Sequence, residues 1–199
     1  MAVNPQEVLA NATLVVPSNR DSNYTVQSAP DWMETIVRTD EGRSIARNQG
    51  IMQADTEWIV LADDDITFPT DLTARLVESM HQHQLIGLED FWPLEWVLTR
   101  YMVFHKSVWE RVDGFDESRE HGEDTDFAIR CEKSGVEIYR LPRQIVPHHD
   151  VDGEFSEIEH SQWLSYLVRR HPARMIPKAL LLLARRLGVV SPRKDYSSP

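Results

Sequence analysis

The apolar positions along the chain fall into two patterns, short continuous runs and longer stretches with helical spacing. The short runs are rich in β-branched and aromatic side chains, which is typical of buried strands. They lie at residues 13–16, 35–37, 58–61, 85–88, 101–104 and 136–141. Helical stretches are expected at residues 42–54, from Pro69 onward and at 123–133. Because strands alternate with helices, the sequence predicts an α/β fold with a mostly parallel, Rossmann-like central sheet flanked by helices.

Two more helices are expected near the end of the chain, at residues 163–168 and 175–187, separated by a proline. The longest apolar run there, residues 179–184, is too short to span a bilayer. We therefore expect an α/β domain over residues 1–155 and a basic C-terminal helical extension over residues 156–199.

The net charge of −11 is unevenly distributed. From residue 161 onward there are eight basic residues and one acid, so the preceding residues carry all of the negative excess. An acidic domain of this kind does not coat nucleic acid, which demands a basic face. Only four of the 21 basic residues are lysine. With the many carboxylates, this resembles a salt-adapted, halophile-like composition; an ordinary acidic protein with arginine-biased codon usage is the alternative.

The chain has a single cysteine, Cys131, so no intramolecular disulfide can form. Cys131 lies in an expected helix, and we interpret it as a small core residue. The amino terminus also lacks the basic-then-apolar layout of a secretory signal. These features predict a cytoplasmic location, with docking at the cytoplasmic face of a membrane left open.

Three consecutive aspartates, Asp63, Asp64 and Asp65, follow the apolar run at 58–61. Adjacent carboxylates repel and raise one another's pKa unless a cation is present. Oxygen ligands at a strand end suit Mg²⁺ or Mn²⁺, above all when substrate phosphates complete the coordination. The pattern predicts a divalent-metal site, with a solvated acidic turn before the next helix as the alternative.

A second acidic group, Glu123, Asp124 and Asp126, opens the helix at 123–133. Acids in a first helical turn interact favourably with the helix dipole, so simple capping is one interpretation. A chemical role is the other, and these residues alone do not decide between the two.

A histidine pair, His148 and His149, follows the apolar residues Ile145 and Val146. We expect the pair to leave a strand end on the same side of the sheet as the aspartates. A neutral imidazole, His148, can then complete a site for a manganese-like ion. Surface placement of both histidines is the alternative.

Five motifs in this order resemble glycosyltransferase family 2, whose members transfer a sugar from a nucleotide-activated donor. They are residues 14–20 (LVVPSNR), 46–50 (ARNQG), 59–65 (IVLADDD), 114–117 (GFDE) and 123–130 (EDTDFAIR). A histidine after the next strand completes the pattern. The resemblance spans roughly residues 12–150 and implies a GT-A fold.

By this resemblance, the aspartate group holds a divalent metal, Mn²⁺ or Mg²⁺, that neutralises the donor diphosphate. Its expected ligands are drawn from Asp63, Asp64, Asp65 and His148. Asp63 and Asp65 bracket the family's Asp-x-Asp motif, whereas alignment on Pro69 puts Asp64 at the main metal position. Which two of the three aspartates act therefore stays open.

The resemblance also assigns catalytic roles at the second acidic group. Asp124 matches the family's general base, which takes the proton of the acceptor hydroxyl as the nucleotide departs with inversion. Glu123 is expected to orient the acceptor or a neighbouring arginine. A base flanked by carboxylates should have a raised pKa suited to proton abstraction.

The nucleotide pocket looks abbreviated, because fewer residues separate Pro17 from Ala46 than the family usually carries. The residues expected to bind the donor are Pro17, Ser18, Asn19, Arg20, Asp40, Arg43, Arg47 and Asp63. Asp40 is the candidate for the family's uracil-contacting aspartate. Arg43 and Arg47 are available to diphosphate oxygens through charge-assisted hydrogen bonds.

These inferences predict an inverting glycosyltransferase that moves a sugar from a UDP- or GDP-sugar to a hydroxyl of a lipid-linked or protein-linked glycan. One alternative is a catalytically impaired GT-A domain that binds a nucleotide sugar without turnover, as the shortened amino-terminal half suggests. Another is a metal-dependent phosphoesterase. The motifs at 46–50 and 114–117 would have no role in a phosphoesterase.

The C-terminal helices suggest one more partner. Trp163, Leu164, Leu167 and the run at 180–183 provide apolar surface beside arginines, as in helices that lie on anionic membranes. Such peripheral contact would suit a lipid-linked acceptor. Alternatively, the helices pack on the domain and their arginines pair with its negative charge.

Overall fold

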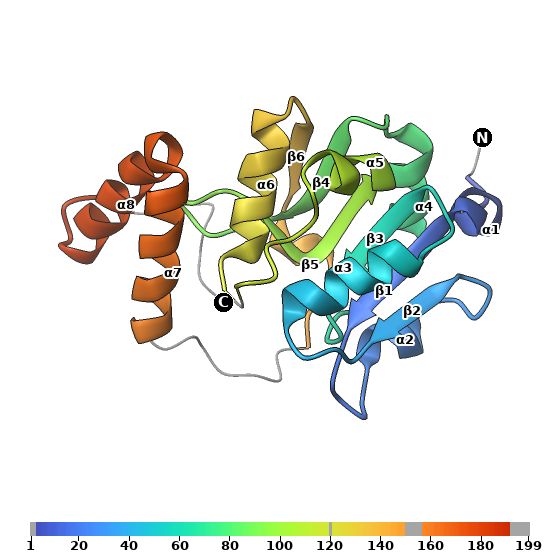
Figure 1. Ribbon diagram of the computed structural model, residues 1–199. Helices are drawn as coiled ribbons and strands as arrows, with labels where there is room; N and C mark the ends of the chain where they lie inside the picture. The colour runs from blue at the N-terminus through green and yellow to red at the C-terminus, as the bar shows by residue number, and fades with distance from the viewer. Residues whose placement is uncertain (1–2, 120, 150–156, 192–199) are drawn as a thin grey trace.

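In a computed structural model of the protein, which describes residues 3–119, 121–149 and 157–191, the strands form one six-stranded sheet (Figure 1). The strands are β1 (Ala12–Pro17), β2 (Thr35–Arg38), β3 (Trp58–Ala62), β4 (Gln84–Glu89), β5 (Val97–His105) and β6 (Glu137–Leu141). Their order across the sheet is β2-β1-β3-β5-β4-β6. β1 pairs in parallel with β2 and β3, and β4 with β6, whereas β5 is antiparallel to its neighbours β3 and β4. The predicted mostly parallel sheet is confirmed.

Helices cover both faces of this sheet (Figure 1). The α-helices are α1 (Pro5–Val8), α2 (Tyr24–Ser28), α3 (Arg43–Gln53), α4 (Thr70–Ser79), α5 (Lys106–Arg111), α6 (Glu123–Lys133), α7 (Glu157–Arg170) and α8 (Pro172–Arg186). Two short 3₁₀ turns are η1 (Leu9–Asn11) and η2 (Arg143–Ile145). Within the described residues, no helix is long and apolar enough to cross a membrane.

The central strand β3 is buried on both faces, which explains its continuous apolar sequence. Ile59 and Leu61 lie in one hydrophobic cluster, together with residues of α3 and α6. Val60 and Ala62, which point the other way, lie in a second cluster with residues of α4. All four side chains are fully buried, so the strand delivers the following aspartates to a fixed place at the sheet edge.

Besides the single-turn helix α1, two helices occur where the sequence analysis expected none. The segment 18–30, expected as loop, contains α2, whose first turn is capped by the Asn23 side chain accepting a hydrogen bond from Val26 N at 3.0 Å. α5 follows β5 directly and is capped in the same way by His105, whose Nδ1 accepts from Ser107 N. Both helices are short and depend on a capping side chain, so they lack the apolar periodicity of a longer helix.

The strand expected to end before His148 is not present. The chain forms η2 instead, and His148 then pairs with Ile66 in an isolated antiparallel bridge. Pro142 and Pro147 flank this stretch. Proline has no N–H to donate to a ladder, so a regular strand is disfavoured there.

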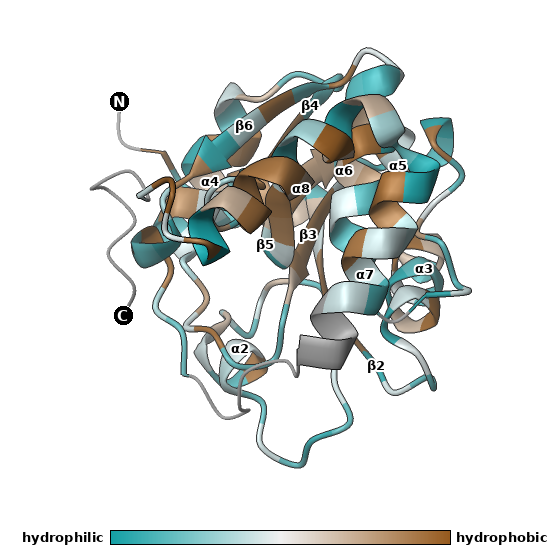
Figure 2. Ribbon diagram, turned by 90° about the vertical axis from the view of Figure 1, so that its left-hand side faces the viewer, coloured by the Kyte–Doolittle hydropathy of each residue, from teal (hydrophilic) through white to brown (hydrophobic). Residues whose placement is uncertain are grey.

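The two C-terminal helices pack on the face of the sheet that α6 covers. Leu167 of α7 and Met175 of α8 are fully buried in the same hydrophobic cluster as Phe127 of α6. Figure 2 looks onto the side of the molecule that these two helices cover.

Candidate active site

The first group of site residues lies where the parallel strands β1 and β3 end side by side. Ser18, just after β1, donates a hydrogen bond through Oγ to Asp64 Oδ2 at 2.5 Å. Arg20 Nη1 donates to the other oxygen, Asp64 Oδ1, at 3.2 Å. Both carboxylate oxygens of Asp64 are therefore already bonded to the segment that follows β1.

Asp65 is placed differently from Asp64. Its Oδ2 lies 3.3 Å from His148 Nε2 and 3.9 Å from Arg20 Nη1. Its Oδ1 is buried and has no hydrogen-bond partner in the part of the chain that the structure describes. Burial raises the pKa of Asp65. His148 lowers this pKa, whereas the negative charges of Asp63 and Asp64 raise it further. A buried, unpaired carboxylate oxygen among like charges favours a bound cation.

The side chains that could coordinate a metal at this edge fit a hard divalent ion, such as Mg²⁺, that leaves some of its coordination positions to water or substrate. Among the described residues, no three histidine, cysteine or acidic side chains converge closely enough to enclose a metal by themselves. Mg²⁺ and similar ions are commonly held by one or two carboxylates, with water and substrate phosphates as the remaining ligands. The free oxygen of Asp65, with His148 beside it and Asp63 two residues earlier, matches that arrangement.

Arg47 of α3 joins the aspartate cluster to the second acidic group. Its guanidinium is buried, with Nη1 2.6 Å from Glu123 Oε1 and Nη2 3.4 Å from Asp63 Oδ1. Burial disfavours the charged form, but Glu123 and Asp63 more than offset this and hold the pKa of Arg47 above its ordinary value. The arginine of the 46–50 motif therefore fixes the spacing between the two halves of the site.

Asp124 stands in the first turn of α6, where the helix dipole is positive. Its Oδ1 accepts a hydrogen bond from Thr125 N at 2.7 Å, and the side chain is half-buried. Burial raises the pKa of Asp124 to about 8; Glu123 and Asp90 add to the shift and Arg47 opposes it. A carboxyl group with a pKa near neutrality is suited to proton transfer.

Asp90 is a site residue that the sequence analysis missed. It follows β4, is buried, and its Oδ1 accepts hydrogen bonds from Phe91 N at 2.7 Å and Arg143 Nη2 at 2.9 Å. Burial raises the pKa of Asp90 to about 6. β4 runs in the same direction as β3, so Asp90 and the aspartate triplet end on the same edge of the sheet. An acid directly after a buried strand was the signal that could have found it.

Two of the sequence motifs are bonded to each other beside this site. Asn48 is buried on α3, its Oδ1 accepts from Phe115 N and its Nδ2 donates to Phe115 O, both at 2.9 Å. The Nδ2 group also donates to Glu117 Oε1 at 2.9 Å. Asn48 therefore holds the 114–117 turn against α3.

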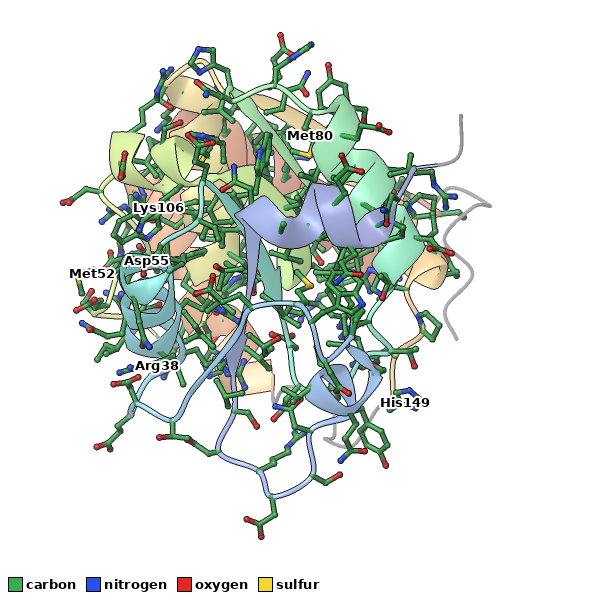
Figure 3. The ribbon with its side chains drawn as sticks, turned by 90° about the vertical axis from the view of Figure 1, so that its right-hand side faces the viewer. Arg38, Met52, Asp55, Met80, Lys106 and His149 are labelled. Carbon is green, nitrogen blue, oxygen red and sulfur yellow. The ribbon has the colours of Figure 1, made fainter. Side chains whose placement is uncertain are left out.

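Four other residues predicted to bind the donor are Asp40, Arg43, Asn19 and Pro17. Asp40 accepts hydrogen bonds from Arg38 at 2.7 and 2.8 Å, and this pairing lowers the pKa of Asp40. Arg38, labelled in Figure 3, is the last residue of β2. Arg43 and Asn19 are exposed, and Pro17 is half-buried at the end of β1.

The His148 side chain reaches an aspartate carboxylate, whereas the His149 side chain has other partners. The His149 ring stacks on Tyr24 of α2 with centroids 4.6 Å apart, and its Nε2 lies 2.8 Å from Thr67 Oγ1 (Figure 3). Its backbone N–H donates to Asp65 O at 2.7 Å. His149 thus anchors the segment that presents His148.

Solved structures define the class of protein to which this fold belongs. The catalytic domain of Drosophila beta1,4galactosyltransferase 7, in complex with xylobiose, is 16% identical over 76% of this chain and 79% of that chain, with a TM-score of 0.53. A Pyrobaculum calidifontis mannosyltransferase in complex with GDP-Man and Mn²⁺ is 14% identical over 94% of this chain and 66% of that chain, with a TM-score of 0.55. TarS of S. aureus, in complex with UDP, is 15% identical over 77% and 63%, with a TM-score of 0.52. The fold is that of the GT-A glycosyltransferases.

The sequence gives the family within that class. The model of glycosyl transferase family 2 matches residues 12–133, more than half of the chain, and the protein belongs to this family. No individually curated protein matches the sequence. The resemblance stated from the motifs is confirmed.

Proposed function

We propose that the protein is an inverting, metal-dependent glycosyltransferase that uses a UDP- or GDP-sugar. The observation that carries the proposal is that two carboxyl groups with different environments belong to one cluster of acids around Arg47. Asp65 offers an unpaired oxygen suited to a cation, and Asp124 has a pKa raised to about 8. Arg47 links the two groups through Asp63 and Glu123.

The metal would be held by Asp65, with His148 and Asp63 as the supporting groups. Asp64 is the weaker candidate, because Ser18 and Arg20 already bond both of its oxygens. When bound, Mn²⁺ or Mg²⁺ supplies positive charge that neutralises the donor diphosphate and helps the nucleotide to depart.

Asp124 would act as general base. Its carboxylate accepts the proton of an acceptor hydroxyl while that oxygen attacks the anomeric carbon, and the nucleoside diphosphate leaves from the opposite face. One C–O bond forms as the other breaks, which inverts the configuration. Glu123 would serve as a positioning residue, because Arg47 holds its carboxylate at 2.6 Å.

The nature of both substrates is part of the proposal. The neighbouring structures contain UDP-Gal with manganese, GDP-Man with Mn²⁺, and UDP, which supports a nucleotide-sugar donor for this chain. An acceptor hydroxyl on a glycan, including a lipid-linked glycan, agrees with the xylobiose bound by one neighbour.

Release of nucleoside diphosphate tests the proposal. The purified protein would be incubated with Mn²⁺, a panel of UDP- and GDP-sugars and oligosaccharide acceptors, and the anomeric product analysed by NMR. A retained configuration would contradict the inverting mechanism. Donor binding with no turnover would favour the impaired domain, and hydrolysis of simple phosphate esters without sugar transfer would favour the phosphoesterase.

A further inference from the structure

One face of α8 carries a row of exposed apolar side chains. Ile176, Leu180 and Leu183 of α8 and Leu187 at its C-cap follow at intervals of four, three and four residues, which places them on one side of the helix. Their side chains are 46%, 61%, 54% and 70% exposed. Figure 2, which looks onto this side of the molecule, colours much of α8 as hydrophobic. A continuous exposed apolar row of this kind marks an interaction surface.

The opposite face of α8 is fixed to the domain, so the apolar row cannot turn inward. Met175 is fully buried and Leu182 packs against the same core cluster. Lys178 Nζ donates to Pro93 O at 2.7 Å, and Arg185 Nη1 donates to Trp92 O at 3.1 Å. These contacts set the rotation of the helix about its axis.

The basic residues of the extension divide into two groups. Arg170, Arg174, Lys178 and Arg185 bind acids or backbone carbonyls of the domain, for example Arg174 Nε to Glu132 Oε2 at 2.5 Å. Arg169 and Arg186 are exposed. The arginines thus both pack on the domain and leave positive charge at the surface.

The charge of the C-terminal helices indicates which kind of surface the apolar row would bind. Residues 161–191 contain no aspartate or glutamate, although the whole chain has a net charge of −11. A second copy of α8 laid against the apolar row would bring arginines together without acidic partners. An anionic lipid surface offers both an apolar interior and opposite charge.

We propose that the row formed by Ile176, Leu180, Leu183 and Leu187 docks the protein on an anionic lipid bilayer. The helix lies in the interface with this row turned toward the acyl chains, and Arg169 and Arg186 contact lipid phosphates. The contact is peripheral, because no described helix can cross a membrane. It needs neither a sugar donor nor a metal, so it stands or fails independently of the glycosyltransferase activity.

Vesicle sedimentation tests this surface. The full-length protein should pellet with vesicles of phosphatidylcholine mixed with phosphatidylglycerol at low salt, and much less with phosphatidylcholine alone or at high salt. The triple variant Leu180→Gln, Leu183→Gln, Leu187→Gln should stay in the supernatant. Met52→Gln is the matched control, since Met52 is 56% exposed on α3, a helix that lies apart from α8 in Figures 1 and 2, and it should pellet like the wild type.

A charge variant guards against a folding defect in the triple variant. Arg169→Glu with Arg186→Glu leaves the apolar row intact and should lose most of the pelleting with anionic vesicles. Wild-type protein that never pellets with anionic vesicles, or a folded triple variant that pellets undiminished, overturns the proposal. So does a concentration-dependent dimer that the triple variant abolishes, because the row would then bind a second copy.

Discussion

His171 Nε2 lies 2.7 Å from Asp126 Oδ1, and both side chains are buried. Lys133 Nζ lies 2.8 Å from the other ring nitrogen of His171, Nδ1. Because an ammonium group can only donate, Nδ1 accepts and the ring proton resides on Nε2, which donates to Asp126. Asp126 is two residues beyond Asp124 on α6, so this bond ties the start of α8 to the helix that carries the proposed base.

The His171 bond should give the protein a pH-dependent stability. Burial lowers the pKa of His171 below its ordinary value of 6.5, and Asp126 opposes the shift. The folded state therefore takes up the proton less readily than the unfolded state. Stability should be highest above about pH 6.5 and fall as the pH decreases from there toward the folded pKa. His171→Gln should flatten this slope in urea titrations between about pH 5 and 8. An unchanged slope would assign the pH dependence to another group.

Asp65→Asn should abolish metal-dependent donor binding, because the diphosphate charge is left without a cation. Isothermal titration with a nucleotide sugar, with and without Mn²⁺, measures the effect. Asp55→Asn is the control, since Asp55 is exposed and lies before β3, at the opposite end of that strand from the three aspartates, and it should leave the metal dependence intact. If Asp64→Asn removes the binding and Asp65→Asn does not, the register of the metal site is shifted by one residue. Full affinity in excess chelator would contradict a metal site altogether.

Asp124→Asn should spare donor binding and lower turnover by about 100-fold or more, the usual scale for loss of a general base. In the wild type, the deprotonated base becomes available as the pH rises through the pKa of about 8. The value of kcat/KM should therefore increase up to that pH and then level off. The variant should lack this rising limb. Equal losses of binding and turnover would give Asp124 a structural role instead.

Gly122→Ala, at the start of α6, should lower the stability of the protein more than Gly135→Ala does. Gly122 has φ +80°, and a Cβ there would lie 2.2 Å from Trp163 Cδ1 of α7. The control is Gly135→Ala, which has φ +89° but open space around the Cβ position. The control should lose about 1 kcal/mol from backbone strain alone, whereas Gly122→Ala should lose more and also lower turnover. Chemical denaturation of both variants compares them, and equal losses would mean that Trp163 moves aside freely.

The sequence predicted the fold well where burial alone determines an element. The continuous apolar run of β3 needs both faces covered, and the structure covers them. The antiparallel direction of β5 could not be predicted from the sequence. A strand buried on both faces has the same continuous apolar pattern whether it runs parallel or antiparallel to its neighbours.

The parts of the site that depend on contacts between segments far apart in the sequence were the hardest to predict. Arg47 was expected to meet diphosphate oxygens, and its partners Asp63 and Glu123 come from elements far apart in the chain. His148 was placed after a strand, but an isolated bridge to Ile66 brings it to Asp65. Asp90 has no motif around it, and its environment depends on Arg143. The order of the motifs predicted that His148 would join the aspartates, but it does not identify the individual atoms that pair across such distances in the chain.

The two outer strands of the sheet bear on how the protein behaves at high concentration. Within the described parts of the chain, β2 and β6 each have a neighbouring strand on one side only, so one row of backbone N–H and C=O groups in each is not paired in the sheet. Both strands are short, β2 ends at the charged Arg38, and the β6 residues Glu137 and Arg140 are exposed. Short edges with charged side chains disfavour pairing with a strand of another molecule. Concentrated solutions should therefore form no intermolecular β-structure and give no amyloid-dye fluorescence.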